Sequence, residues 1–305
     1  MQGVGGLYTV RILAEDSSLF GSLTDCRARG SFRHNNMTPL AGDNVTLLPA
    51  EASGDGKGQY VIDEITDRKN SLIRPPLANL DYIFVTMAAA APLPVLTTVD
   101  KLICIAEFNN IEPVIVITKK ELDSEYAEKL ERLYRSCGFD VFSVSAVEDV
   151  GIDALQNYIN EKLPSKTAAF AGASGIGKST LLNKLFPNLS LTTSEISRKI
   201  QRGRHTTRKV ELFPLSDSAD CGYIADTPGF SMLDFERFDF FEKDDLAGTM
   251  REFRDLIGEC RYTKCSHTKE EGCAIVEAVK DGRIPRSRHE SFCELYETLK
   301  KKTKW

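Results

Sequence analysis

Residues 172–179 read Gly-Ala-Ser-Gly-Ile-Gly-Lys-Ser, in which two glycines five positions apart are followed by a lysine and a serine. Glycines such as Gly175 and Gly177 let the backbone come close enough for its N–H groups to surround a phosphate. Lys178 would add a positive charge at the outer phosphates, and the Ser179 hydroxyl would be a ligand of Mg²⁺. The predicted phosphate-binding residues are Gly172, Ala173, Ser174, Gly175, Ile176, Gly177, Lys178, Ser179 and Thr180.

The segments on either side favour the same interpretation. Residues 167–171 predict a short buried strand, and residues 179–186 predict a helix with Leu181, Leu182 and Leu185 on one face. A phosphate held by the loop would then lie at the positive end of a helix. The alternative is a chance glycine turn, which would not require this strand and helix. We therefore predict that the chain binds a nucleoside triphosphate together with Mg²⁺.

The composition bounds the kind of protein. The chain has 305 residues, 42% of them hydrophobic and 27% charged, and a net charge of −5, which argues against a wholly basic nucleic-acid binder. No apolar run approaches the roughly 20 residues that cross a membrane. Three of the eight cysteines surround one histidine, which suggests a reducing compartment and a metal site. We expect a cytoplasmic protein with no membrane partner, and nothing demands more than a monomer.

Residues 1–72 predict an all-β domain. Strand patterns cover residues 7–13, 44–48 and 59–65, with turn clusters between them. Several short strands in so short a segment suit a small OB-fold barrel, and such barrels often bind RNA. Cationic and stacking groups would come from Arg27, Arg29, Phe32, Arg33 and His34. A purely structural barrel is the alternative.

Residues 73–233 predict an α/β domain. The expected strands are 82–87, 113–118, 141–145 and 167–171, and the expected helices are 96–108, 124–136 and 152–163. Such alternation indicates a parallel sheet covered on both faces. The phosphate-binding loop follows the fourth of these strands, whereas in most phosphate-loop enzymes it follows the first.

The segments after the loop are typical of GTPase switches. Asp226-Thr227-Pro228-Gly229 follows a predicted strand, so Asp226 would hold Mg²⁺ and the Gly229 N–H would contact the γ-phosphate. The basic segment 198–209 contains Thr206 and Thr207, either of which could reach Mg²⁺. A solvated charged loop is the alternative for that segment.

The segments before the loop fit the recognition of a base. Residues 118–121, Thr-Lys-Lys-Glu, stand at a strand end where a GTPase carries Asn-Lys-x-Asp. Ser145 and Ala146 fit the second guanine loop. The predicted guanine-binding residues are Thr118, Lys119, Lys120, Glu121, Ser145 and Ala146. Base-reading segments therefore precede the phosphate loop and switches follow it, which is a circularly permuted order (G4-G5-G1-G2-G3).

A metal site is predicted in residues 234–305. Cys260-x4-Cys265-x-His267-x5-Cys273 supplies three thiolates and one imidazole, a complete tetrahedral set for one structural Zn²⁺. The segment 280–305 holds eight Lys/Arg and four Asp/Glu, which suits an RNA backbone, although a solvated helix end is the alternative.

This motif order resembles that of the RsgA/YjeQ family, the circularly permuted GTPases of small ribosomal subunit biogenesis. The matching segments are residues 76–81, 112–116, 143–146, 172–179, 203–207 and 226–230. The resemblance implies an OB-fold domain, a permuted GTPase domain and a mainly helical zinc domain. It also implies GTP hydrolysis stimulated by the 30S subunit, binding of 16S rRNA, a role in late 30S maturation, and catalysis by His205.

The chain departs from the GTPase pattern at two places. Thr118 and Glu121 replace Asn and Asp, and Thr118 cannot supply the paired donor and acceptor of an amide. Phe230 stands where Ras-like enzymes carry a water-orienting Gln, which leaves His205 as the candidate. Two alternatives stay open: a nucleotide-gated RNA-binding assembly module with vestigial hydrolysis, and an ATPase.

Overall fold

The structure is a computed structural model that describes residues 2–4, 6–30, 32, 37–50, 60–73, 75–187, 210–218, 220–226 and 241–301. The chain forms two compact units. One comprises Met1–Tyr82, Tyr158–Phe170 and Phe186–Phe230, and the other comprises Ile83–Asn157, Ala171–Leu185 and Ser231–Trp305. Among the described residues, no helix combines the length and apolar character that crossing a bilayer requires.

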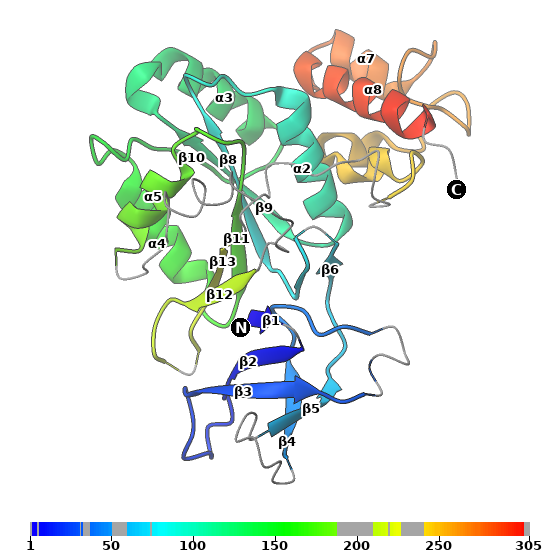
Figure 1. The fold of residues 1–305 in the computed structure, drawn as a ribbon. Coiled ribbons are helices and arrows are strands. Elements are labelled where there is room, and N and C mark those ends of the chain that lie inside the picture. The colour runs from blue at the N-terminus through cyan, green and yellow to red at the C-terminus, as the bar shows by residue number, and fades with distance from the viewer. Residues whose placement is uncertain are drawn as a thin grey trace, which may run out of the picture. The chain divides into compact units, whose positions relative to one another are not determined.

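The N-terminal sheet has five strands (Figure 1). In spatial order they are β1 (Gln2–Val4), β2 (Leu7–Arg11), β3 (Leu23–Ala28), β5 (Tyr60–Ile65) and β4 (Val45–Pro49). Strands β3 and β5 run parallel and the other neighbours antiparallel. Val10, Cys26 and Ile62 are buried between them. The sequence patterns did not predict β3, because Cys26 is the only fully buried side chain of that strand and gives almost no alternating signal.

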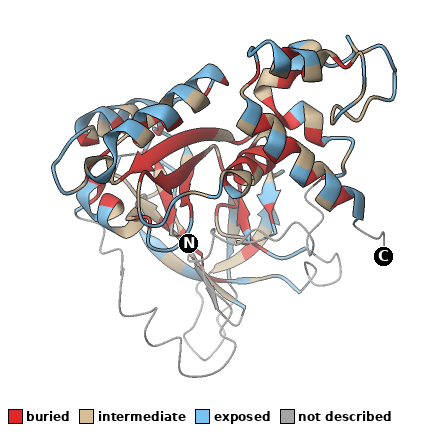
Figure 2. Cartoon of the chain, turned by 90° about the horizontal axis from the view of Figure 1, so that it is seen from above, coloured by how far each residue is buried: buried red, intermediate tan, exposed pale blue. Residues whose placement is uncertain are grey.

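The second sheet has six strands in the order β10-β9-β8-β11-β13-β12. Their bounds are β10 Val141–Ser143, β9 Glu112–Thr118, β8 Tyr82–Ala88, β11 Thr167–Ala171, β13 Tyr223–Asp226 and β12 Glu211–Pro214. The pairs β10–β9 and β11–β13 are parallel, and β12 runs antiparallel to β13. In each of the strands β8, β9 and β11, every residue after the first is buried. Buried strands appear red in Figure 2. Continuous burial of this kind confirms the predicted α/β sheet and indicates cover on both faces.

Four helices accompany this sheet: α2 (Leu96–Phe108), α3 (Ser124–Ser136), α4 (Ile152–Lys162) and α5 (Lys178–Leu185). Helix α3 begins where the Asp123 carboxylate accepts a hydrogen bond from the Tyr126 N–H at 2.9 Å. Its buried residues Ala127, Leu130 and Tyr134 recur at intervals of three and four, which places them on one face. Two short strands, β6 (Ser71–Leu72) and β7 (Leu77–Ala78), pair antiparallel around the prolines at 75–76.

The C-terminal segment contains the short 3₁₀ turns η2 (Leu246–Thr249) and η3 (Arg251–Leu256), then helices α7 (Ala274–Lys280) and α8 (Arg286–Lys301). Helix α8 packs against α2. A fully buried arginine, Arg288, lies in this contact and pairs with Asp100 of α2 and with Glu252 of η3, the latter at 2.6 Å. This ion cluster was not predicted from the sequence. Its one available signal was an arginine among the apolar positions of a helix that includes Phe292 and Leu295.

Candidate nucleotide and metal sites

The loop between β11 and α5 has the backbone that its glycines predict. Gly172, Gly175 and Gly177 have φ values of 155°, 80° and 87°, which side chains rarely tolerate. A Cβ atom on Gly172 would lie 2.2 Å from the Thr86 carbonyl oxygen and 2.5 Å from Ile176 Cδ1. Glycine is therefore required at 172 for steric as well as conformational reasons. Helix α5 begins at Lys178, directly after the last of these glycines, and the Leu181 N–H donates to the Gly177 carbonyl at 3.0 Å.

The predicted base-reading segment is tied directly to this loop. Thr118 ends β9 and is buried, and its hydroxyl lies 2.5 Å from the Ile176 carbonyl oxygen and 3.1 Å from that of Met87. The Lys119 ammonium donates to the carbonyl oxygens of Gly175 at 2.8 Å and Ala91 at 2.5 Å. Two consecutive side chains of the predicted base-reading segment thus bond to the backbone of the predicted phosphate loop.

The other predicted base-reading residues adjoin one another. The Lys120 N–H donates to the Val144 carbonyl at 3.3 Å, which joins the 118–121 segment to the strand end before Ser145. Ser145 is buried and forms a backbone bridge with Val150, while its hydroxyl accepts from the Glu148 N–H at 3.1 Å. Glu121 differs from its neighbours. Its Oε2 atom is buried, and no hydrogen-bond partner for it lies in the part of the chain that the structure describes.

Only some of the predicted switch residues are among the residues that the structure describes. Asp226 is the last residue of β13, and the parallel register pairs its neighbour Ala225 with Ala169 of β11. His205, Thr206, Thr207 and Gly229 lie outside the described residues. Their predicted roles therefore remain predictions.

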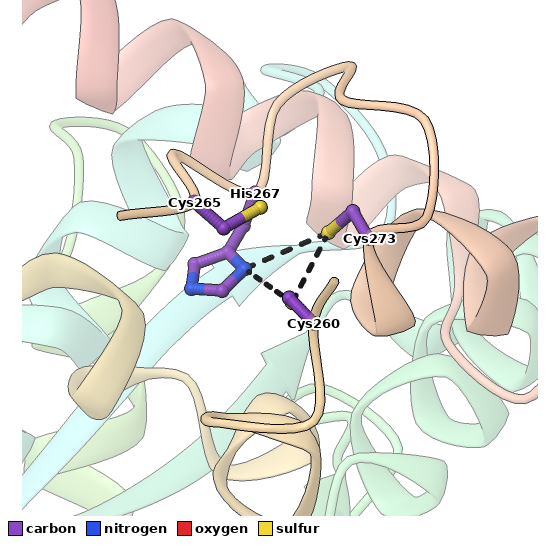
Figure 3. Close-up of side chains that lie close together, drawn as sticks. All are labelled: Cys260, Cys265, His267 and Cys273. Atoms are coloured by element: carbon purple, nitrogen blue, oxygen red, sulfur yellow. Dashed lines mark hydrogen bonds between the residues drawn. The ribbon is translucent and has the colours of Figure 1, made fainter. Parts of the chain in front are cut away.

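The four predicted metal ligands meet in the C-terminal segment (Figure 3). The ligand atoms of Cys260, Cys265, His267 and Cys273 all lie within 4.8 Å of one another. Cys260 Sγ is 3.8 Å from Cys273 Sγ, and His267 Nδ1 is 3.4 Å from Cys260 Sγ and 3.6 Å from Cys273 Sγ. Tetrahedral Zn²⁺ with its usual bond lengths would give about 3.8 Å between sulfurs and about 3.6 Å between sulfur and nitrogen. The donor set and its spacing therefore fit a metal ion.

Local backbone structure brings these ligands together. The Arg261 N–H donates to the Gly272 carbonyl at 2.9 Å, which sets Cys260 beside Cys273. Cys273 also caps α7, where its sulfur accepts from the Val276 N–H at 3.5 Å. Burial lowers the pKa of His267, which keeps its imidazole neutral and able to bind a cation. Burial raises the pKa of the Cys265 thiol to about 12, so a bound cation would supply the charge that stabilises its thiolate.

The glycine-rich loop at residues 172–177 lies between a strand and a helix, and Thr118 and Lys119 of another segment bond to it. This arrangement defines a phosphate-loop nucleotide-binding protein. Comparison with known proteins narrows this class. The family model described as RsgA GTPase matches residues 65–236, and that described as RsgA N-terminal domain matches residues 1–57.

Whole-length relatives agree. The small ribosomal subunit biogenesis GTPase RsgA of Caldanaerobacter subterraneus subsp. tengcongensis is 38% identical over 305 residues, covering 100% of this chain and 96% of the relative. The crystal structure of YjeQ from Thermotoga maritima is 31% identical with a TM-score of 0.78, covering 98% of this chain and 96% of that one. The crystal structure of YloQ, described as a circularly permuted GTPase, is 33% identical with a TM-score of 0.74, covering 99% and 94%. The chain therefore belongs to the RsgA family of circularly permuted GTPases, which confirms the resemblance that its motif order predicted.

Proposed function

We propose that this GTPase hydrolyses GTP to GDP and phosphate with Mg²⁺ and acts in late maturation of the small ribosomal subunit. The observation that carries the GTP site is the set of hydrogen bonds from Thr118 and Lys119 to the phosphate loop. These bonds support the proposal because they join segment 118–121 to the glycine-rich loop, although the bonded partners are 58 and 56 positions apart in the sequence. The subunit role is supported by the relatives, which carry the name small ribosomal subunit biogenesis GTPase.

In this proposal the loop amides and Lys178 hold the phosphates, and Ser179 and Asp226 serve Mg²⁺ together with Thr206 or Thr207. The Gly229 N–H senses the γ-phosphate. His205 positions the attacking water, because Phe230 has no polar atom with which to do so. Hydrolysis is slow until the protein binds the 30S subunit, which acts through the switch segments.

Glu121 is the residue that selects guanine. A carboxylate only accepts hydrogen bonds, and the buried Oε2 of Glu121 has no donor within the described structure. Guanine offers N–H donors on its pairing edge, whereas the ring nitrogen of adenine in that position is an acceptor. Thr118 contributes by holding the loop, since its single O–H is directed at backbone carbonyls.

The two remaining domains bind the RNA partner. The N-terminal segment 1–72 is an OB-fold barrel and segment 234–305 a zinc domain, on either side of GTPase residues 73–233. Both bind 16S rRNA, the barrel through its cationic and aromatic side chains and the zinc domain through the basic segment 280–305. The protein acts as a cytoplasmic monomer.

Nucleotide titrations of Glu121→Gln test the guanine assignment. The substitution should weaken GTP binding by roughly 10- to 100-fold, because a hydrogen bond to a charged group contributes about 1.5–3 kcal/mol. ATP binding should not weaken. Glu125→Gln, on the exposed side of α3, removes the same charge and should leave both affinities unchanged. Equal loss of GTP and ATP binding, or ATP binding as tight as GTP binding in the unmodified protein, would contradict the assignment and favour an ATPase.

A further inference from the structure

One carboxylate organises the backbone between the metal ligands. Glu270 Oε1 accepts the Ser266 N–H at 2.8 Å and also the Ser266 hydroxyl. Its Oε2 accepts the Thr268 N–H at 3.0 Å and the Lys269 N–H at 3.1 Å. The two residues that flank His267 are therefore bound to the same side chain, and Ser266 also directly follows the ligand Cys265.

These bonds fix an unfavourable backbone conformation. His267 has a φ of 59°, in the left-handed region, which costs a residue with a side chain about 1–2 kcal/mol. Such a conformation persists only where the surroundings impose it. Glu270 holds both neighbours of His267, and His289 Nε2 of α8 lies 2.8 Å from the His267 carbonyl oxygen. The backbone that carries the His267 imidazole is thus held by Glu270 and by His289.

The charge of Glu270 suits this task. Burial alone would raise the pKa of Glu270, but hydrogen bonds from the Ser266 side chain and from backbone amides outweigh it and hold the pKa at about 2. The adjacent Glu271 is exposed and offers a carboxylate of the same charge for comparison.

We propose that Glu270 is a positioning residue for the metal site: it holds residues 266–269 so that Cys265 and His267 face Cys260 and Cys273 before the ion binds. The inference rests on the proposed structural zinc site and adds the residue that preorganises it. Groups that orient metal ligands typically contribute about 10- to 100-fold in metal affinity.

The test compares Glu270→Gln with Glu271→Gln in the full chain. Zinc affinity is measured by competition with a chromophoric chelator, and ligand geometry by the absorption spectrum of the cobalt-loaded protein. Glu270→Gln should bind zinc about 10- to 100-fold more weakly and shift the cobalt spectrum. Glu271→Gln should match the unmodified protein in both. A general structural role for Glu270 would instead lower the melting temperature of the metal-free protein while leaving its zinc affinity and cobalt spectrum unchanged.

Ser266→Ala provides a milder second variant, because it removes the hydroxyl bonds to Glu270 and to Thr268 but keeps the three backbone N–H bonds to the carboxylate, and it should show a smaller loss in the same direction. It decides the matter if Glu270→Gln does not fold. Zinc affinities of Glu270→Gln or Ser266→Ala equal to that of Glu271→Gln would overturn the role of Glu270 while leaving the zinc site standing. Failure of the unmodified protein to bind zinc would overturn the zinc site itself.

Discussion

Replacing Arg288 by Met should destabilise the protein strongly. Arg288 is fully buried, and its partners Asp100 and Glu252 are only 1% and 5% exposed. Asp100 also accepts the Tyr134 hydroxyl at 3.0 Å. Removing the guanidinium leaves two carboxylates in the interior without a cation. Breaking a buried ion pair in this way costs about 3–5 kcal/mol of unfolding free energy.

The same helix carries a matched control. Arg286 is 86% exposed and pairs with Glu290 at 2.9 Å, one turn away. An exposed pair of this kind contributes about 0–1 kcal/mol, so Arg286→Met should change stability little. Unfolding free energies come from urea titrations followed by circular dichroism. A loss below about 1 kcal/mol for Arg288→Met, or equal losses for the two variants, would mean that the buried ion cluster does not stabilise the fold as its geometry predicts.

A combined variant checks the cause of that loss. Adding Asp100→Asn and Glu252→Gln to Arg288→Met removes the unpaired charges and should recover part of the lost stability, because neutral groups are far less costly to bury than charges. No recovery would mean that Arg288 acts through packing, for instance through its approach to the Tyr134 ring, 5.8 Å from the ring centre.

Three further predictions concern the two sites. Gly172→Ala should abolish nucleotide binding, because the new Cβ atom would lie 2.2 Å from the Thr86 carbonyl oxygen. Gly138→Ala is the control: Gly138 also has a positive φ, but its new Cβ atom would have no atom within 4 Å, so nucleotide binding should stay intact. Equal affinities of the two variants in a fluorescent-nucleotide titration would contradict this prediction. Lys119→Met removes the bonds to Gly175 and Ala91 and should weaken GTP binding, while Lys129→Met on the exposed part of α3 should not, as the same titration would show. Chelation of the metal should lower the melting temperature reversibly, since an ion present at 1,000 times its dissociation constant stabilises the folded protein by about 4 kcal/mol. A melting temperature that changes with neither chelator nor added zinc would count against a structural metal.

Local patterns predicted the central sheet well. Helices 96–108 and 124–136 and strand 167–171 occur with the predicted bounds, because apolar periodicity and flanking turn residues act locally. The grouping of Cys260, Cys265, His267 and Cys273 was also predictable, because their spacing in the sequence is typical of a metal site and the structure brings the four side chains together.

Contacts between distant segments were not readable. The sequence around Thr118 does not predict that its hydroxyl bonds to the Ile176 carbonyl, because that bond depends on how two strand ends are placed in the sheet. The pairing of Arg288 with Asp100 joins residues 188 positions apart and likewise follows from helix packing. The role of Glu270 was hidden for another reason: its partners are mostly backbone amides, which carry no sequence signal.

The most direct test of the proposed function is steady-state phosphate release from GTP and from ATP, each with and without purified small ribosomal subunits. We expect slow release from GTP that rises many-fold when the subunits are added, and little release from ATP in either case. Release that ignores the subunits, or that is as fast from ATP as from GTP, would contradict the proposed function.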